Sequence, residues 1–90
     1  MGVAATIENK LTAALRPTRL KVVDESHLHK GHGGYRPGGE SHFRVEIVSP
    51  AFEGQSRVAR QRRIYEILAD ELKGGVHALA LTTLTPGEDL

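Results

Sequence analysis

The apolar residues of this 90-residue chain recur with two different periods along the sequence. One period is typical of helices and the other of strands, so the changes between them predict the order of the elements. Residues 4–15 carry apolar side chains three or four positions apart, which predicts an amphipathic helix that Pro17 prevents from continuing. Residues 19–23 and 42–49 instead alternate apolar and polar side chains, as half-buried strands do. We therefore expect a helix followed by two strands that pair as a hairpin.

The second half of the chain returns to the helical period before it ends in another strand. Ser56 is the expected N-cap of a helix over residues 56–73, and a short helical turn is expected before it, at residues 51–53. Two glycines after residue 73 end this helix, and residues 76–83 read as a third strand. The pattern predicts an α+β two-layer sandwich with a three-stranded mixed sheet and helices on one face.

Length and composition limit what this fold can do. Ninety residues, 39% of them apolar, form one domain over residues 1–90, with a core at about 4–84 and a polar tail at 85–90. Little apolar material remains to enclose a deep substrate cavity, and no apolar run approaches the ~18 residues that span a bilayer.

The chain has no cysteine, which fits a reducing compartment. We expect a soluble, cytoplasmic protein without a secretory or transit segment.

Histidines gather in and around a glycine-rich connection at residues 26–41. Metal ligation is a common role of the imidazole side chain. One alternative is that the loop histidines are solvated, and that His77 is a semi-buried structural residue sharing strand parity with Leu79. Against it, a loop histidine and one at the mouth of a strand can converge on an exposed metal. The five histidines are His27, His29, His32, His42 and His77.

The absence of cysteine narrows the type of metal site. A structural zinc site usually includes thiolate, and an iron-sulfur cluster needs thiolates on at least one iron, so this chain cannot complete a cluster alone. Two imidazoles can hold one iron of a [2Fe-2S] unit, as Rieske centres show, if another molecule supplies sulfur ligands. Such a site implies a partner, whereas a loop that only sequesters zinc or copper does not.

A cluster of arginines begins the helix at residues 56–73. No acid lies among residues 54–65, and acids follow at the far end, an order that the helix dipole disfavours. A basic helix start can meet DNA phosphates or an acidic protein surface, and the alternative is an ordinary charged solvent face. The net charge of +1 does not mark a chain built to coat nucleic acid. The cluster comprises Arg57, Arg60, Arg62 and Arg63.

Catalysis has little support in the sequence. There is no nucleophile elbow around any serine and no H-E-x-x-H motif, and the neighbouring carboxylates Asp24 and Glu25 lie on opposite faces of a strand. We do not expect an enzyme.

Several blocks in a fixed order give the sequence a family resemblance. They are VVDES at 22–26, ESHF at 40–43, FEG at 52–54, R-x-I-Y at 62–65 and VHALAL at 76–81. Taken together, they resemble the BolA family across residues 7–86. The resemblance implies an α-β-β-α-α-β fold similar to class II KH domains, without the GxxG loop.

The resemblance also implies a function. BolA-like chains pair with monothiol glutaredoxins and share a [2Fe-2S] cluster held by a glutaredoxin cysteine, a glutathione thiol and BolA histidine. By resemblance, the ligands here are His77 and His29. The loop is then of the His type, and His27 and His32 are the substitutes for His29 within it. The chain would be a non-enzymatic adaptor that binds, transfers or senses the cluster. Alone, it would be a monomer or a weak homodimer.

The alternative function implied by the same resemblance is transcription regulation. Bacterial BolA-like proteins are described as DNA-binding regulators of cell shape and stress response, through a helix-turn-helix region that corresponds to residues 50–73 here. The arginine cluster lies within that region.

Overall fold

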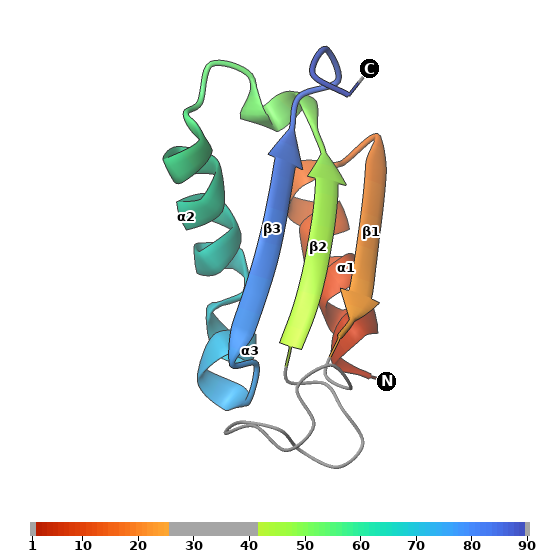
Figure 1. Cartoon of the computed structure of the whole chain (residues 1–90), viewed down its shortest axis with the longest axis vertical. Coiled ribbons are helices and arrows are strands. Elements are labelled where there is room, and N and C mark those ends of the chain that lie inside the picture. The colour runs from red at the N-terminus through yellow and green to blue at the C-terminus, as the bar shows by residue number, and fades with distance from the viewer. Residues whose placement is uncertain (1, 26–41, 90) are drawn as a thin grey trace.

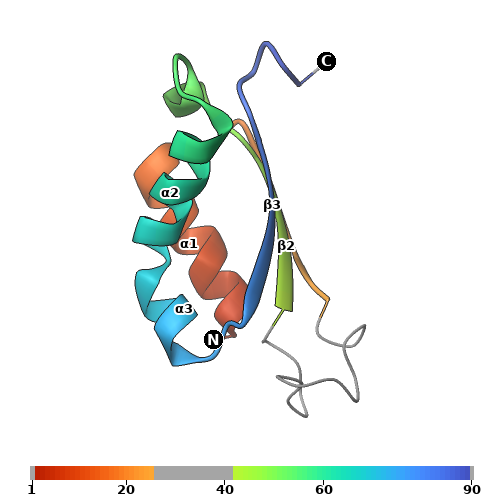
Figure 2. The ribbon, with the colours of Figure 1, turned by 60° about the vertical axis from the view of Figure 1, so that its left-hand side comes forward.

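Helices cover one face of a three-stranded sheet in the computed structural model, which describes residues 2–25 and 42–89 (Figure 1). Figure 2 shows both long helices on the same side of the sheet. The predicted α+β class and mixed sheet are confirmed. In chain order, the elements are α1 (Val3–Leu15), β1 (Arg19–Asp24), β2 (His42–Val48), the 3-10 helix η2 (Pro50–Phe52), α2 (Arg57–Ile67), α3 (Ala69–Gly74) and β3 (Ala78–Leu84).

Strand β2 is the central strand of the sheet. It pairs antiparallel with β1, with Asp24 opposite Phe43, and parallel with β3, with His42 opposite Ala78. The parallel pair requires a crossover, which η2, α2 and α3 provide. Consequently β2 and β3 start at the same end of the sheet at which β1 finishes.

Strand alternation divides the sheet into a buried and an open face. Phe43, Val45 and Ile47 point toward the helices and are at most 2% exposed, whereas Arg44 on the opposite face is exposed. Against them pack buried side chains from α1, η2, α2 with its C-cap Leu68, and the segment before β3. Together these side chains form one core cluster of Ile7, Leu11, Leu15, Phe43, Val45, Ile47, Phe52, Ile64, Leu68 and Val76.

The helix expected over residues 56–73 is two helices. Ser56 caps α2 as predicted, its Oγ accepting a hydrogen bond from the Ala59 amide at 3.1 Å. Leu68 leaves helical geometry, with φ −100° and ψ 20°, and separates α2 from α3 while its side chain stays fully buried. Asp70 and Glu71 therefore lie in the first turn of α3, where the helix dipole favours acids. Only the arginines near the start of α2 therefore carry charge of the sign that the helix dipole disfavours there.

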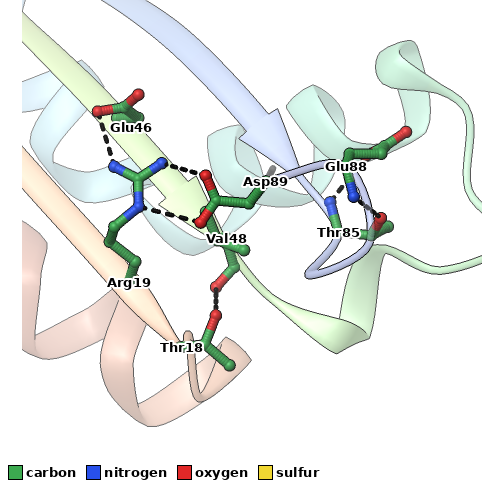
Figure 3. A network of polar contacts seen from close by, with 7 residues as sticks. All are labelled: Thr18, Arg19, Glu46, Val48, Thr85, Glu88 and Asp89. Atoms are coloured by element: carbon green, nitrogen blue, oxygen red, sulfur yellow. Dashed lines mark hydrogen bonds and ion pairs between the residues drawn. The ribbon is translucent and has the colours of Figure 1, made fainter.

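The tail after β3 packs onto the fold. Asp89 accepts hydrogen bonds from Arg19 at 2.8 and 3.2 Å, and Arg19 also pairs with Glu46 at 3.0 Å (Figure 3). Val48, on the open face of the sheet by strand alternation, is only 1% exposed beside these side chains. Thr85 and Glu88 close a turn through the bond from the Thr85 amide to Glu88 Oε1, at 2.8 Å. The segment predicted to be a polar tail is thus polar but held in place.

Acid is expected to weaken this tail. Hydrogen bonds from Arg60 and from the Thr85 amide lower the pKa of Glu88 from 4.5 to about 2, and Arg19 lowers the pKa of Asp89. Because both folded-state pKa values are depressed, the stabilisation is complete above the ordinary carboxyl pKa and is lost as pH falls toward 2. In urea denaturation, the stability difference between wild type and Glu88→Gln should be constant near neutral pH and shrink between about pH 5 and 2. A difference independent of pH would contradict this role of Glu88.

Candidate functional site

His77 lies in the short segment that connects α3 to β3. Gly75 adopts φ 149°, a conformation that favours glycine, and the Val76 amide bonds to the Glu71 carbonyl at 3.0 Å. Val76 is buried in the core, whereas His77 is exposed. Because His77 precedes β3, the parity argument for a semi-buried structural histidine does not apply.

His42 is the neighbour of His77, and sequence reasoning did not select it. It begins β2 and is half-buried, and its ring centre lies 6.1 Å from that of His77, with 37° between the ring planes. His42 begins β2 and His77 directly precedes β3, which pairs with β2 in parallel, so their approach follows from the register of His42 with Ala78. A prediction that β2 and β3 run parallel could have identified this pair.

The connection that carries the other three histidines begins and ends at this end of the sheet. Its flanks are tied together by the hydrogen bond from the Glu25 amide to the His42 carbonyl, at 2.8 Å. His29, His27 and His32 lie outside the described residues, so their part in a metal site stays a prediction. The described geometry establishes that the chain enters and leaves the connection at the end of the sheet where His77 lies.

A shallow depression of about 380 Å³ opens beside His42, which helps to line it. Its polar side includes Glu25, which pairs with Arg44 at 2.9 Å and raises the pKa of that guanidinium. Its lining consists of Glu25, His42, Phe43, Arg44, Ala78, Leu79 and Ala80.

Three of the four candidate arginines are on the surface. Arg57, Arg62 and Arg63 are exposed on α2. The same helix carries Val58 and Tyr65, which are 56% and 41% exposed. The exposed part of α2 therefore combines positive charge with apolar and aromatic surface.

The prediction of a binding role is wrong for Arg60, which is only 6% exposed. Its guanidinium donates to the Gln55 carbonyl at 3.0 Å, the Thr83 carbonyl at 3.0 Å and Glu88 at 2.7 Å. It also lies over the Phe52 ring, 5.8 Å from the ring centre. Arg60 thus joins α2 to β3 and the C-terminal turn and is not available to a ligand.

Nothing in residues 2–25 and 42–89 forms a helix long and apolar enough to cross a membrane.

Comparison with known proteins agrees on one family. The family model described as BolA-like protein matches residues 11–88. A Sinorhizobium protein encoded in the cobS 5′ region is 54% identical over 89 residues, covering 98% of this chain and 96% of that protein. The Escherichia coli DNA-binding transcriptional regulator BolA is 48% identical over 85 residues, covering 94% of this chain and 77% of the regulator.

Comparison with solved structures indicates the same family. The solved BolA domain of SufE1 from Arabidopsis thaliana is 46% identical and superposes with a TM-score of 0.88 over 98% of each chain. The two proteins therefore share the arrangement of helices and strands as well as sequence. The chain therefore belongs to the BolA family.

Proposed function

We propose that the chain is a non-enzymatic adaptor that pairs with a monothiol glutaredoxin and shares a [2Fe-2S] cluster with it. The observation that carries this proposal is the position of His77, exposed at the end of the sheet where the histidine-rich connection begins and ends. Family membership supports it, because the resemblance assigns this position to a cluster ligand. The cluster is cargo held between two proteins.

The chemistry of the donors fits this cargo. Exposed imidazole nitrogen can bind iron, and a half-cluster held by histidine needs thiolates only on its other iron. The chain has no cysteine, so glutaredoxin and glutathione must supply every sulfur ligand outside the cluster itself. In the proposed complex, His77 presents one imidazole from a segment fixed by buried Val76, and His29 reaches from the connection to present the other.

The isolated chain is expected to remain colourless after incubation with iron and sulfide. Two imidazoles and no thiolate leave the second iron without anionic protein ligands. Visible absorption after desalting checks this result. The matched sample contains the chain at the same concentration together with glutaredoxin and glutathione. A stable cluster spectrum from the chain alone would contradict the shared-ligand proposal.

A second candidate function is DNA binding by α2. Its specific support is the exposure of three arginines on α2, Arg57, Arg62 and Arg63, together with a relative named as a DNA-binding transcriptional regulator. Lysine and arginine contacts to phosphate release counterions, so the affinity of such a surface depends steeply on salt. With Arg60 buried, three arginines remain to make these contacts.

Replacing Arg57, Arg62 and Arg63 with glutamine tests this candidate. If each neutralises one phosphate, the slope of log affinity against log salt should become less negative by roughly 2.7, at about 0.9 per contact. Stability should stay within about 0.5 kcal/mol of wild type, because all three side chains are exposed. Fluorescence anisotropy with duplex DNA at several salt concentrations measures the slope. An unchanged slope would exclude these arginines as phosphate contacts.

A further inference from the structure

We propose that His42 and His77 form an open two-imidazole site for a divalent transition metal such as Zn²⁺. This site is built entirely from described residues and requires neither glutaredoxin nor the glycine-rich connection. The ion is bound by the two side chains and completes its coordination with water or with a ligand from another molecule.

The distance between the rings is close to that required for a shared ion. A zinc-imidazole bond is about 2.0–2.1 Å long, and two imidazoles on one tetrahedral ion have ring centres roughly 5 Å apart. The observed separation is 6.1 Å. Because His77 is exposed and lies outside the strand, a small rotation of its side chain can close the remaining gap.

The backbone around the pair is already ordered. Strand pairing holds His42 opposite Ala78, and buried Val76 anchors the residue before His77. The two Cα atoms therefore do not have to be brought together when the ion binds, which lowers the entropic cost of forming the site.

The surroundings determine the class of metal. No group of three or more metal-binding side chains occurs within residues 2–25 and 42–89, so the pair leaves coordination positions open. The depression of about 380 Å³ that His42 helps to line gives water or a foreign ligand access to the ion from the His42 side. Imidazole nitrogen suits Zn²⁺, Cu²⁺ and Ni²⁺, whereas Mg²⁺ and Ca²⁺ prefer oxygen.

The test removes every competing imidazole. The chain has five histidines and no cysteine, so His27→Asn, His29→Asn and His32→Asn leave only His42 and His77. In this full-length triple variant, Zn²⁺ titration is followed by calorimetry and by the imidazole ¹⁵N resonances, with Mg²⁺ as the control. We expect one Zn²⁺ per chain, parallel shifts of both imidazoles and no response to Mg²⁺.

Two further variants assign the ligands. Adding His42→Gln or His77→Gln should each weaken Zn²⁺ binding by about tenfold or more, because one of two protein ligands is lost. Circular dichroism checks that each variant is folded. The imidazole spectra of the triple variant identify the ligands independently, because His42 and His77 are both intact in it. Failure to bind Zn²⁺, a shift of only one imidazole, or unchanged affinity in either added variant would overturn the proposal. Because glutaredoxin is absent, these results are independent of the cluster proposal.

Discussion

Arg60→Gln is expected to lower the free energy of unfolding by about 2–4 kcal/mol, a large share of the stability of a small domain. The guanidinium is 6% exposed and bonds to the Gln55 and Thr83 carbonyls and to Glu88. Glutamine is too short to reach all three partners. The substitution therefore removes charge-assisted hydrogen bonds and leaves a buried carbonyl on β3 unsatisfied.

Arg62→Gln is the matched control, since it makes the same chemical change at an exposed position of the same helix. Its free energy of unfolding should remain within about 0.5 kcal/mol of wild type. Urea denaturation of both variants at neutral pH provides the comparison. Equal stability of the two variants would show that the buried contacts of Arg60 contribute little.

His77→Ala is expected to remove nearly all of the cluster from the proposed complex with glutaredoxin. His77 is the one proposed ligand for which the resemblance names no substitute, whereas loss of His29 leaves His27 and His32 nearby in sequence. The fold should be retained because the side chain is exposed. Iron content and visible absorption of the reconstituted complex measure the loss.

His29→Ala is the comparison variant and should retain more cluster than His77→Ala. Circular dichroism and apo-complex formation with glutaredoxin show whether either substitution acts through folding or docking instead. Equal losses in the two variants, or full retention in His77→Ala, would contradict the ranking of ligands.

Local patterns were sufficient to predict most of the fold. The spacing of apolar residues predicted α1 and the strands because side chains in helices and strands repeat with fixed periods, and the cap at Ser56 depends only on the three residues that follow it. The break at Leu68 was not predicted, because the apolar stripe of Ile64 and Leu68 continues across it. The break is a change in backbone geometry that leaves the buried face intact.

The site depended more on contacts between distant segments. Arg60 was grouped with its charged neighbours, although it lies four residues before Ile64 and therefore on the buried stripe of α2. Its partners Thr83 and Glu88 are 23 and 28 residues away. His42 was missed for the same reason, since its proximity to His77 requires the parallel pairing of β2 and β3.

Reconstitution of the chain with a monothiol glutaredoxin and glutathione tests the cluster proposal most directly. Size-exclusion chromatography with simultaneous protein and visible absorbance, followed by iron and sulfide analysis, gives the composition of the coloured species. We predict one chain, one glutaredoxin and one [2Fe-2S] cluster, with a visible spectrum different from that of glutaredoxin reconstituted alone. Elution of the chain as a colourless separate peak, with the glutaredoxin spectrum unchanged by its presence, would contradict the proposed function.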